Sequence, residues 1–481
     1  QARLLCCPFL CYPVPMRRAL IAGCSLLCFL LPHVGQGQVV YHPEAGFPVD
    51  ARHFAPEEYG AFMQNWAVVQ DGRGLIYVAN NYGILEYDGE SWRLIRTRTS
   101  TIVRALARDS AGTVYVGMQG DFGYLKSNAA GELQYVSLIE HLDPEAADFK
   151  DIWSVHVTSS GVYFQARQWL FRWDGREMKK WKAEGAFHTS FVVRGQFYMR
   201  EHGRGLLTVL GDSLQFIDRG EYFRDLSVYA LMPMSEGRML IGTRKKGFLI
   251  YDHGEITPLI TDADQLLEQH DLYGGTVLPD GSFALATLGA GIIVIDEAGR
   301  LLRVYNTASG LADNWVNAVY VDDQGGLWAA LNAGGIMRMQ VMPAISVLDD
   351  RLGIEGFVFQ VVRHDGVLYV YTSAGLFSLQ TQKDASAWDV KRPYFEYLGS
   401  VDMVRSFLSV GGSLVLGTDK GIYTLRGDEF DLISESAAVN VFHLVRSSIF
   451  PNRIYAGTKE GLAFLQHTTA GWKELEKVPG V

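Results

Sequence analysis

The sequence predicts an all-β fold made of repeated units, and three observations support this prediction. One phrase recurs along the chain: a hairpin turn with Gly, an aromatic-rich strand, a second Gly and another strand. The second glycines recur at a nearly constant spacing, with one gap about twice as long as the others. The strand segments alternate apolar and polar side chains without a long helical pattern. A period of about 40–45 residues with this alternation is typical of one four-stranded blade of a β-propeller.

The number of copies follows from the spacing of these glycines. The long gap between Gly123 and Gly205 holds a degenerate copy from Gly161 to Phe171, so the chain contains ten copies. HEAT and armadillo repeats have a similar length, but they require amphipathic helices that these alternating segments do not supply. Ten copies therefore predict ten blades. The clear copies are marked by Gly83, Gly123, Gly205, Gly247, Gly291, Gly335, Gly375, Gly421 and Gly461.

Each part of a copy has its own structural role. An Asp-x-x-Gly element, as from Asp109 to Gly112, predicts a tight hairpin, because Gly accepts positive φ and Asp can bond the backbone two residues on. The Leu/Val-Trp/Tyr-Val/Ile segment after it predicts a half-buried strand. A Thr-x-x-Gly turn, as from Thr418 to Gly421, leads to a third strand. The outer strand often follows an Asp-Gly turn and carries a Trp, as at Trp92.

The copies fall into two groups. Seven lie between about residues 65 and 339, and a Pro-containing break separates them from three more that end near Trp472. Seven blades close a ring of ordinary size, whereas three blades leave strand edges unpaired. We therefore expect one complete seven-bladed ring at residues 38–342, followed by the first three blades of a second propeller at residues 343–481. A single ring of ten blades is the alternative.

The N-terminal segment has the pattern of a secretory signal peptide at residues 16–37: a Met, two arginines, an apolar run and a small-residue exit. Residues 1–15 are expected to be a non-translated or upstream extension. The apolar run, from Ala19 to Leu31, is too short to span a membrane. A lipobox ending at Cys24 is an alternative, although most of the apolar run follows that cysteine. The pattern predicts export to the periplasmic or extracellular side.

Cysteine content and charge exclude several classes of function. All five cysteines lie in this leader, so the exported chain is expected to have no disulfide, thiolate metal site or Cys nucleophile. The net charge is −10, and the segment up to Gln38 holds three arginines and no acid, so the remainder is more acidic still. This balance argues against a nucleic-acid partner. The cysteines are Cys6, Cys7, Cys11, Cys24 and Cys28.

Three segments carry a family resemblance. Residues 65–92 begin with Asn-Trp and end with Asp-Gly-Glu-Ser-Trp, residues 120–124 read Gly-Asp-Phe-Gly-Tyr, and residues 310–328 contain Gly-Leu-Ala-Asp-Asn before an Asp-Asp-Gln-Gly-Gly-Leu-Trp hairpin. Together they resemble the bacterial two-component-regulator propeller family, and the resemblance covers essentially the whole chain after the leader. As a set these motifs are specific, although each alone is weak.

The resemblance implies a periplasmic sensor. Members of this family typically carry two seven-bladed propellers, a small β-sandwich with a triple-tyrosine motif, a membrane helix, and a cytoplasmic output such as a histidine kinase or a DNA-binding helix-turn-helix. The sequence contains none of the later modules, so it is expected to be a C-terminally truncated ectodomain, tethered to the membrane through the missing part. A downstream kinase or transcription-regulator module and a possible homodimer are the expected protein partners.

Motifs of catalysis are absent from the sequence. It has no His-Glu-x-x-His helix, Gly-x-Ser-x-Gly elbow or phosphate loop. The Asp-Asp-Gln-Gly segment at Asp322 superficially suggests a calcium loop, but it lacks the remaining ligands and the closing Glu, which favours a turn. Its likeness to the Asp-box turns of sialidases implies no activity, since those turns are structural. We therefore expect no catalytic residue, cofactor or metal in this chain.

The mouth of the central channel is the expected ligand site. In a propeller, the start of each inner strand and the turn between the second and third strands lie on the same face, around the largest concavity. Aromatic planes beside amides and Arg would suit a carbohydrate or an acidic sugar. Candidates at strand starts are Asn65, Trp66, Asp151, Trp153, Asn314 and Trp315; candidates at second turns are Asn80, Asn81, Asp121, Phe122, Arg167, Arg204, Arg244, Lys245 and Asn332.

Each candidate also has a structural interpretation. The three tryptophans could pack between blades, the asparagines could serve turn conformation, and the Arg244-Lys245-Lys246 run could be a solvated turn. The sequence thus favours a non-enzymatic, extracytoplasmic propeller that senses an unidentified small molecule or carbohydrate for a signal-transduction regulator. A secreted polysaccharide lyase or hydrolase and a purely structural scaffold are the alternatives.

Overall fold

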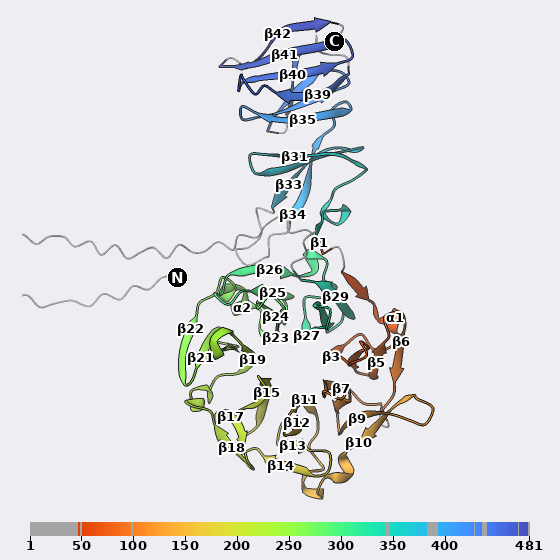
Figure 1. The fold of residues 1–481 in the computed structure, drawn as a ribbon, viewed down its shortest axis with the longest axis vertical. Helices are drawn as coiled ribbons and strands as arrows, with labels where there is room; N and C mark the ends of the chain where they lie inside the picture. Colours follow the sequence, from red (N-terminus) through yellow and green to blue (C-terminus); the bar gives the residue numbers. More distant parts are fainter. Residues whose placement is uncertain are drawn as a thin grey trace, which may run out of the picture. The chain divides into compact units, whose positions relative to one another are not determined.

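A computed structural model describes residues 47–48, 51–97, 100–341, 346–381, 393–427, 429–434, 440–469 and 471–479. The expected extension, the signal peptide and all five cysteines lie outside these residues. Within them the fold is all-β, with four-stranded antiparallel sheets following one another along the chain (Figure 1). No helix in this described part is both long and apolar enough to cross a membrane.

The first seven sheets are the blades of a propeller. Blades one to three are β3 (Asn65–Gln70), β4 (Ile76–Asn80), β5 (Gly83–Tyr87) and β6 (Trp92–Ile95); β7 (Val103–Arg108), β8 (Val114–Met118), β9 (Asp121–Ser127) and β10 (Leu133–Ser137); and β11 (Ile152–Thr158), β12 (Gly161–Ala166), β13 (Trp169–Trp173) and β14 (Met178–Lys182). Blades four and five are β15 (Phe187–Val193), β16 (Gln196–Glu201), β17 (Gly205–Leu210) and β18 (Ser213–Phe216); and β19 (Val228–Pro233), β20 (Met239–Thr243), β21 (Phe248–Asp252) and β22 (Glu255–Leu259).

Blade six is β23 (Leu272–Val277), β24 (Phe283–Thr287), β25 (Ile292–Ile295) and β26 (Leu301–Tyr305), and blade seven contains β27 (Val316–Val321), β28 (Gly326–Leu331) and β29 (Ile336–Gln340). Short helical segments lie between strands: α1 (Pro56–Tyr59), α2 (Asp264–Gln269), and 3₁₀ turns at Ile139–His141, Pro144–Ala146, Gly220–Phe223, Ser235–Gly237, Thr307–Ser309 and Asp350–Leu352.

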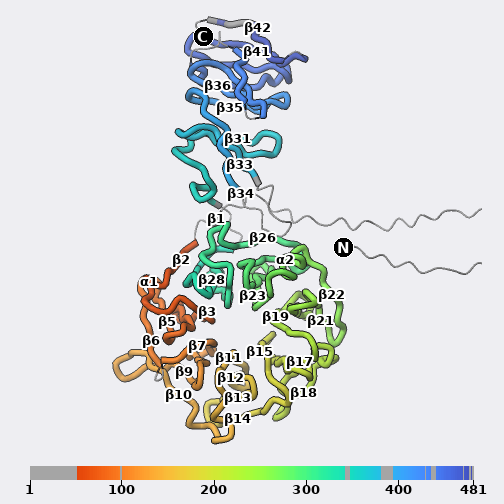
Figure 2. The backbone as a smooth tube through the Cα atoms, turned by 180° about the vertical axis from the view of Figure 1, so that it is seen from behind, coloured from red at the N-terminus to blue at the C-terminus, as the bar shows by residue number. Residues whose placement is uncertain are grey.

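Seven blades close the ring. Each inner strand contacts the inner strand of the next blade, and β27 of blade seven contacts β3 of blade one. Figure 2 shows the same ring from behind, with β3, β7, β11, β15, β19 and β23 around its centre. The seven-bladed ring is therefore confirmed, and the alternative of a single ten-bladed ring is wrong. The inner strands are β3, β7, β11, β15, β19, β23 and β27.

The outer strand of blade seven comes from the other end of the ring sequence. β2 (Arg52–Phe54) pairs antiparallel with β29, and the strand order of this sheet is β2-β29-β28-β27. Phe54 is 1% exposed, and its ring stacks on Trp328 of β28 with centroids 5.7 Å apart. The repeat phrase could not reveal this closure, because β2 lies before the first copy and carries none of its motifs.

Hydrophobic layers fill the spaces between neighbouring blades. Phe122 of β9 packs on Phe164 of β12, with ring centroids 4.5 Å apart. At the end of β8, Gly117 lies so close to β11 that a Cβ atom there would collide with the Ile152 side chain. The repeated small residues thus set how closely one blade approaches the next.

Asp322 forms a hairpin turn and not a calcium loop. Its carboxylate accepts hydrogen bonds from the backbone N–H groups of Gln324 and Gly326 at 3.0 and 2.7 Å, and from Trp328 Nε1 at 2.9 Å. The Arg338 guanidinium of β29 donates to the same carboxylate at 2.8 Å. Both carboxylate oxygens are thus engaged within blade seven. Across the described residues, no group of three or more His, Cys, Asp or Glu side chains could hold a metal ion.

Three further sheets have the same blade order, and we call them the three-blade array. They are β31 (Val358–His364), β32 (Val367–Thr372), β33 (Gly375–Thr381) and β34 (Pro393–Gly399); β35 (Val404–Val410), β36 (Ser413–Thr418), β37 (Ile422–Arg426) and β38 (Glu429–Ser434); and β39 (Val441–Arg446), β40 (Arg453–Thr458), β41 (Gly461–Thr468) and β42 (Gly471–Pro479). A two-residue ladder joins β1 (Phe47–Pro48) and β30 (Ser346–Val347). The predicted β-propeller fold is confirmed, and the boundaries at residues 342 and 343 stay a prediction.

Candidate functional site

Every inner strand of the ring has a bulge at its second residue. In blade one, Asn65 pairs with Asn80 and Ala67 with Ala79, so Trp66 between them has no partner. A bulge turns the side chain of the extra residue away from the regular pleat. Because the same irregularity recurs in all seven blades, one side chain from each blade is directed to the mouth of the channel. These bulge residues are Trp66, Arg104, Trp153, His188, Tyr229, Tyr273 and Asn317.

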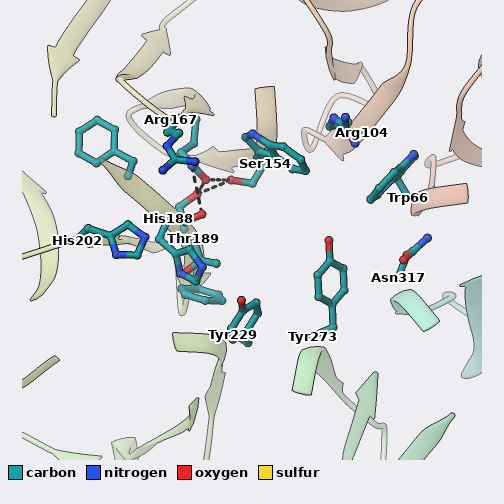
Figure 3. A pocket seen from close by; sticks show the side chains of 15 residues that line it. Trp66, Arg104, Ser154, Arg167, His188, Thr189, His202, Tyr229, Tyr273 and Asn317 are labelled. Carbon is teal, nitrogen blue, oxygen red and sulfur yellow. Dashed lines mark hydrogen bonds between the residues drawn. The ribbon is translucent and has the colours of Figure 1, made fainter. Parts of the chain in front are cut away.

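The seven bulge residues line one cavity at the channel mouth (Figure 3). Its volume is about 430 Å³, within the range of small-molecule sites. Blades three and four supply the other lining residues, which are Ser154, Gln165, Arg167, Phe187, Thr189, Ser190, Phe191 and His202. None of these fifteen residues is Asp or Glu, so the lining carries cations, aromatic rings and neutral polar groups.

A cation lies between two indole rings on one side of the cavity. The guanidinium carbon of Arg104 is 4.7 Å from the centre of the Trp66 ring and 4.2 Å from that of Trp153. Arg104 Nε donates to Asp151 Oδ1 at 2.9 Å, and Trp66 Nε1 donates to Asn81 Oδ1 at 2.7 Å. Trp153 remains 44% exposed. The arrangement fixes the orientation of the rings and leaves an aromatic surface open to a ligand.

A cluster of neutral polar groups lies at the junction of blades three and four. Ser154 Oγ is 2.8 Å from Gln165 Oε1 and 2.5 Å from Ser190 Oγ, as the dashed lines in Figure 3 show. Gln165 is 1% exposed, and its Nε2 donates to the backbone oxygen of Ala166 at 3.3 Å. Buried polar groups with this many mutual bonds hold fixed positions, so this part of the cavity lining is pre-organised.

Two histidines on blade four complete this side of the cavity. Burial lowers the pKa of His188 to about 4, and the nearby cations Arg200, Arg244 and Arg167 contribute to the shift. Burial, with the charge of Arg200, also lowers the pKa of His202. Both imidazoles are therefore neutral near pH 7 and can act as hydrogen-bond partners without adding charge.

Three of the predicted site residues line this cavity: Trp66, Trp153 and Arg167. Two others support it from behind, because Asn81 holds the Trp66 indole and Asp151 holds the Arg104 guanidinium. Arg244 lies beside the lining residue Tyr229, with its guanidinium carbon 5.8 Å from that ring, and forms an ion pair with Asp271.

The remaining candidates do not line the cavity, and most of them form hydrogen bonds or ion pairs within the loops. Asn65 and Asn80 are fully buried and bond each other at 2.8 Å. Asp121 is 1% exposed and accepts from the Phe122 N–H, while the Phe122 ring is in the core. The others are Arg204, paired with Glu201 and Glu184; Asn314, which accepts from the Thr307 N–H; Asn332, which accepts from Gln64 Nε2; and the exposed Lys245 and Trp315.

Sequence reasoning missed most of the lining, including Arg104, His188, His202, Tyr229, Tyr273 and Asn317. A usable signal was present, because Trp66 precedes Asp71 by five positions, as Arg104 precedes Asp109 and Asn317 precedes Asp322. In these copies the bulge residue thus lies five positions before the Asp of the first hairpin. The strand pairing was needed to show that this position faces the channel.

Fold and cavity together define a propeller with a ligand-sized concavity at its channel mouth. No protein-family model matches the chain, and no curated protein matches it in sequence. Among solved structures, it is similar to the extracellular domain of the putative hybrid two component system BT3049 from B. thetaiotaomicron, with a TM-score of 0.58 and 16% identity over 89% of this chain and 60% of that one.

Two other solved structures resemble the chain less closely. The extracellular domain of the putative one component system BT4673 from the same organism gives a TM-score of 0.47 at 14% identity, over 90% of this chain and 60% of that one. Virginiamycin B lyase from Staphylococcus aureus gives a TM-score of 0.47 at 11% identity, over 61% of this chain and 99% of that one. The chain spans 60% of the length of the two regulator domains. The likeness to BT3049 is one of fold, and it confirms the fold implied by the family resemblance.

Proposed function

We propose that this chain is the extracytoplasmic ligand-sensing propeller of a bacterial signal-transduction regulator, and that its ligand binds in the cavity at the channel mouth. The observation that carries this proposal is the convergence of one bulge residue from each of seven blades on a single cavity of about 430 Å³. Sharing the fold of a regulator's extracellular domain supports the same conclusion. Export by the N-terminal leader and attachment to a membrane are parts of this proposal.

The proposed ligand is a small molecule or carbohydrate. Exposed indole surface at Trp153 can stack on the apolar face of a sugar ring, while Ser154, His202 and Asn317 offer hydrogen bonds to hydroxyl groups. The polar cluster of Ser154, Gln165 and Ser190 is already ordered by its own bonds, so less conformational entropy is lost on binding.

Signalling requires that the ligand bind one arrangement of the protein better than another. A change in packing between protomers of a dimer, or in how the ring engages a downstream kinase or transcription-regulator module, would meet this requirement. If so, a saturating ligand should change the association state or the scattering profile of the protein. Identical profiles with and without the ligand would contradict this mechanism.

A binding panel with two matched variants tests the site. Trp153 and Trp315 are 44% and 45% exposed, but only Trp153 lines the cavity. Oligosaccharides and small metabolites are titrated into the chain by calorimetry. We expect Trp153→Ala to weaken binding at least about tenfold, which corresponds to about 1.4 kcal/mol, and Trp315→Ala to leave it unchanged. Equal effects, or no binding by any member of the panel, would contradict the proposal.

The same panel separates sensing from catalysis. Incubation with polysaccharides at micromolar protein is followed by chromatography of the products. The sensing proposal predicts binding without turnover, whereas product release at catalytic rates would replace it with the lyase or hydrolase alternative.

A further inference from the structure

Blades three and four differ from the rest of the ring at one position on the second strand. This residue pairs with the third residue of the inner strand, next to the bulge, and in the other five blades it is small. In blades three and four it is Gln165 and Arg200, which are only 1% and 2% exposed. Large polar side chains therefore replace small ones on this side of the cavity. The small residues are Ala79, Gly117, Gly242, Ala286 and Ala330.

Arg200 is a buried cation that forms no salt bridge with any described residue, and the carboxylate whose charge acts on it, that of Asp225, is not within ion-pair distance. One terminal nitrogen donates to His202 Nδ1 at 2.6 Å, and the other donates to the backbone oxygen of Arg224 at 3.0 Å. Its Nε is buried without a hydrogen-bond partner in the described part of the chain. A buried charge is unfavourable unless an opposite charge or strong hydrogen bonds compensate it. Neither of its two acceptors is a carboxylate.

The bond from Arg200 fixes the tautomer of His202. A guanidinium can only donate, so His202 Nδ1 must be the acceptor and the ring proton resides on Nε2. His202 lines the cavity, and Nε2 has no partner among the described residues. The polarised imidazole thus presents an N–H donor, backed by a positive charge, to whatever occupies the cavity (Figure 3).

Arg167 adds a second donor on the same side. It lines the cavity, its side chain is exposed, and it forms no ion pair with any described residue. The Arg167 and His202 backbones are hydrogen-bonded to the neighbouring residues Phe187 and Ala186 at 2.8 and 2.9 Å, and Figure 3 shows both side chains on the same side of the cavity as His188. By contrast, Arg104 is paired with Asp151 and Arg244 with Asp271. The positive charge without a salt-bridge partner among the described residues is therefore that of Arg167 and of Arg200, and Arg200 is bonded to the neutral His202.

We infer that this corner binds an anionic group of the ligand, a carboxylate or a sulfate ester, which accepts hydrogen bonds from the Arg167 guanidinium and from His202 Nε2–H. Charge-assisted bonds of this kind are strong, and the planar fork of Arg suits both oxyanions. The inference rests on the proposed function in that it uses the same cavity. The inference specifies a ligand with a negatively charged group and excludes an uncharged ligand.

The experiment uses the anions themselves as probes. Imidazole resonances of the full chain are followed by NMR at constant ionic strength during titration with glucuronate, with sulfate and with neutral glucose, and His202→Gln identifies the His202 signal. We expect a saturable shift of this signal with at least one anion and none with glucose. A response to glucuronate alone indicates that the ligand carries a carboxylate, and a response to sulfate alone indicates a sulfate ester. A response to both supports an anion site that accepts either group. Absence of a saturable response to either anion would overturn the inference.

Two arginine variants distinguish specific anion binding in the cavity from a general effect of surface charge. Arg167→Gln should weaken the anion response about tenfold or more. Arg176→Gln provides the control, because Arg176 is an exposed arginine of the same blade that is outside the cavity and has no ion pair with any described residue. Equal loss in both variants would overturn the inference. If oligosaccharide binding is weakened by Trp153→Ala but not by Arg167→Gln, the proposed function stands and this inference is refuted. If it is weakened by Arg167→Gln but not by Trp153→Ala, the anion site stands and the proposed binding mode at Trp153 is refuted.

Discussion

The closed ring and the three-blade array have blades of one design, but their inner strands have different surroundings. Each array blade also has a bulge at the second residue of its inner strand, at Phe359, Arg405 and Phe442. The order aromatic, Arg, aromatic repeats that of Trp66, Arg104 and Trp153 in blades one to three. The guanidinium carbon of Arg405 is 5.5 Å from the centre of the Phe442 ring.

Exposure shows what the closed ring adds. In β3, four of six residues are buried, including the last three, whereas Val358, Phe359 and Val361 of β31 are 53%, 54% and 56% exposed. The bulge is thus a local property of one blade, encoded by its own pairing. A cavity lined from all sides requires seven such blades to converge.

Loss of Phe54 should have the largest effect. Phe54→Ala removes a side chain that is 1% exposed and lies in an aromatic cluster with Trp328, Tyr87 and Trp92. We expect the ring to lose about 3–5 kcal/mol of stability, because a buried Phe is replaced by a cavity on the closing strand. Hydrogen exchange should show reduced protection of β29 and β3. Phe395→Ala, in the outer strand of an array blade, is the control and should leave the protection of β29 and β3 unchanged; loss of protection there in both variants would contradict the role of β2 in closure.

Asp322→Asn should have the next largest effect. It breaks the ion pair with Arg338 and weakens the bond from Trp328 Nε1. Since the Arg338 side chain is 27% exposed, we expect a loss of about 2–4 kcal/mol, less than for a fully buried pair. Asp365→Asn, at the exposed first hairpin of β31 and β32, should change stability by no more than about 0.5 kcal/mol. Urea unfolding followed by tryptophan fluorescence measures the stability of both variants. Similar losses of stability would show that Asp322 stabilises the ring only through its hairpin turn and not through its ion pair with Arg338.

Stability of the ring should fall in acid through two histidines. Burial lowers the pKa of both His156 and His188 to about 4, from an ordinary value of 6.5. Between pH 6.5 and 4 the unfolded chain binds protons that the folded ring excludes, so stability decreases as pH falls through this window. Each group should contribute about 1–3 kcal/mol of this loss. His156→Gln, which can retain a donor to the Ser190 carbonyl, should reduce the slope of stability against pH; an unchanged slope would contradict the assignment.

The cation–π contacts should give the smallest effect. Arg104 is 4.2 Å from the Trp153 ring centre, whereas Arg405 is 5.5 Å from that of Phe442. A double-mutant cycle of Arg104→Gln with Trp153→Leu should give a coupling of about 0.5–1 kcal/mol. The cycle of Arg405→Gln with Phe442→Leu should give less, because the distance is longer and Phe is the weaker partner. Equal couplings from thermal unfolding would show that closure of the ring does not strengthen this contact.

Local sequence features predicted the blade correctly. The Asp-x-x-Gly hairpin, the aromatic strand and the Thr-x-x-Gly turn each reflect a backbone requirement that a few neighbouring residues satisfy. Trp66, Trp153 and Arg167 were placed at the channel mouth because the topology of a propeller fixes which strand ends share a face. Asn65 and Asn80 occupy the same face, but they bond each other and the loops, and sequence alone could not distinguish these two uses of a polar side chain.

The amino-acid sequence by itself determined the all-β fold, the ten copies and the division into seven and three, because hairpins and strand alternation depend on residues close together in the chain. Only the tertiary structure decided that β2 closes the ring, that the seven bulge residues converge on one cavity, and that Arg167, Arg200 and His202 lie on one side of it. These features join residues that are distant in sequence, and their energies come from pairing and packing that no single copy contains.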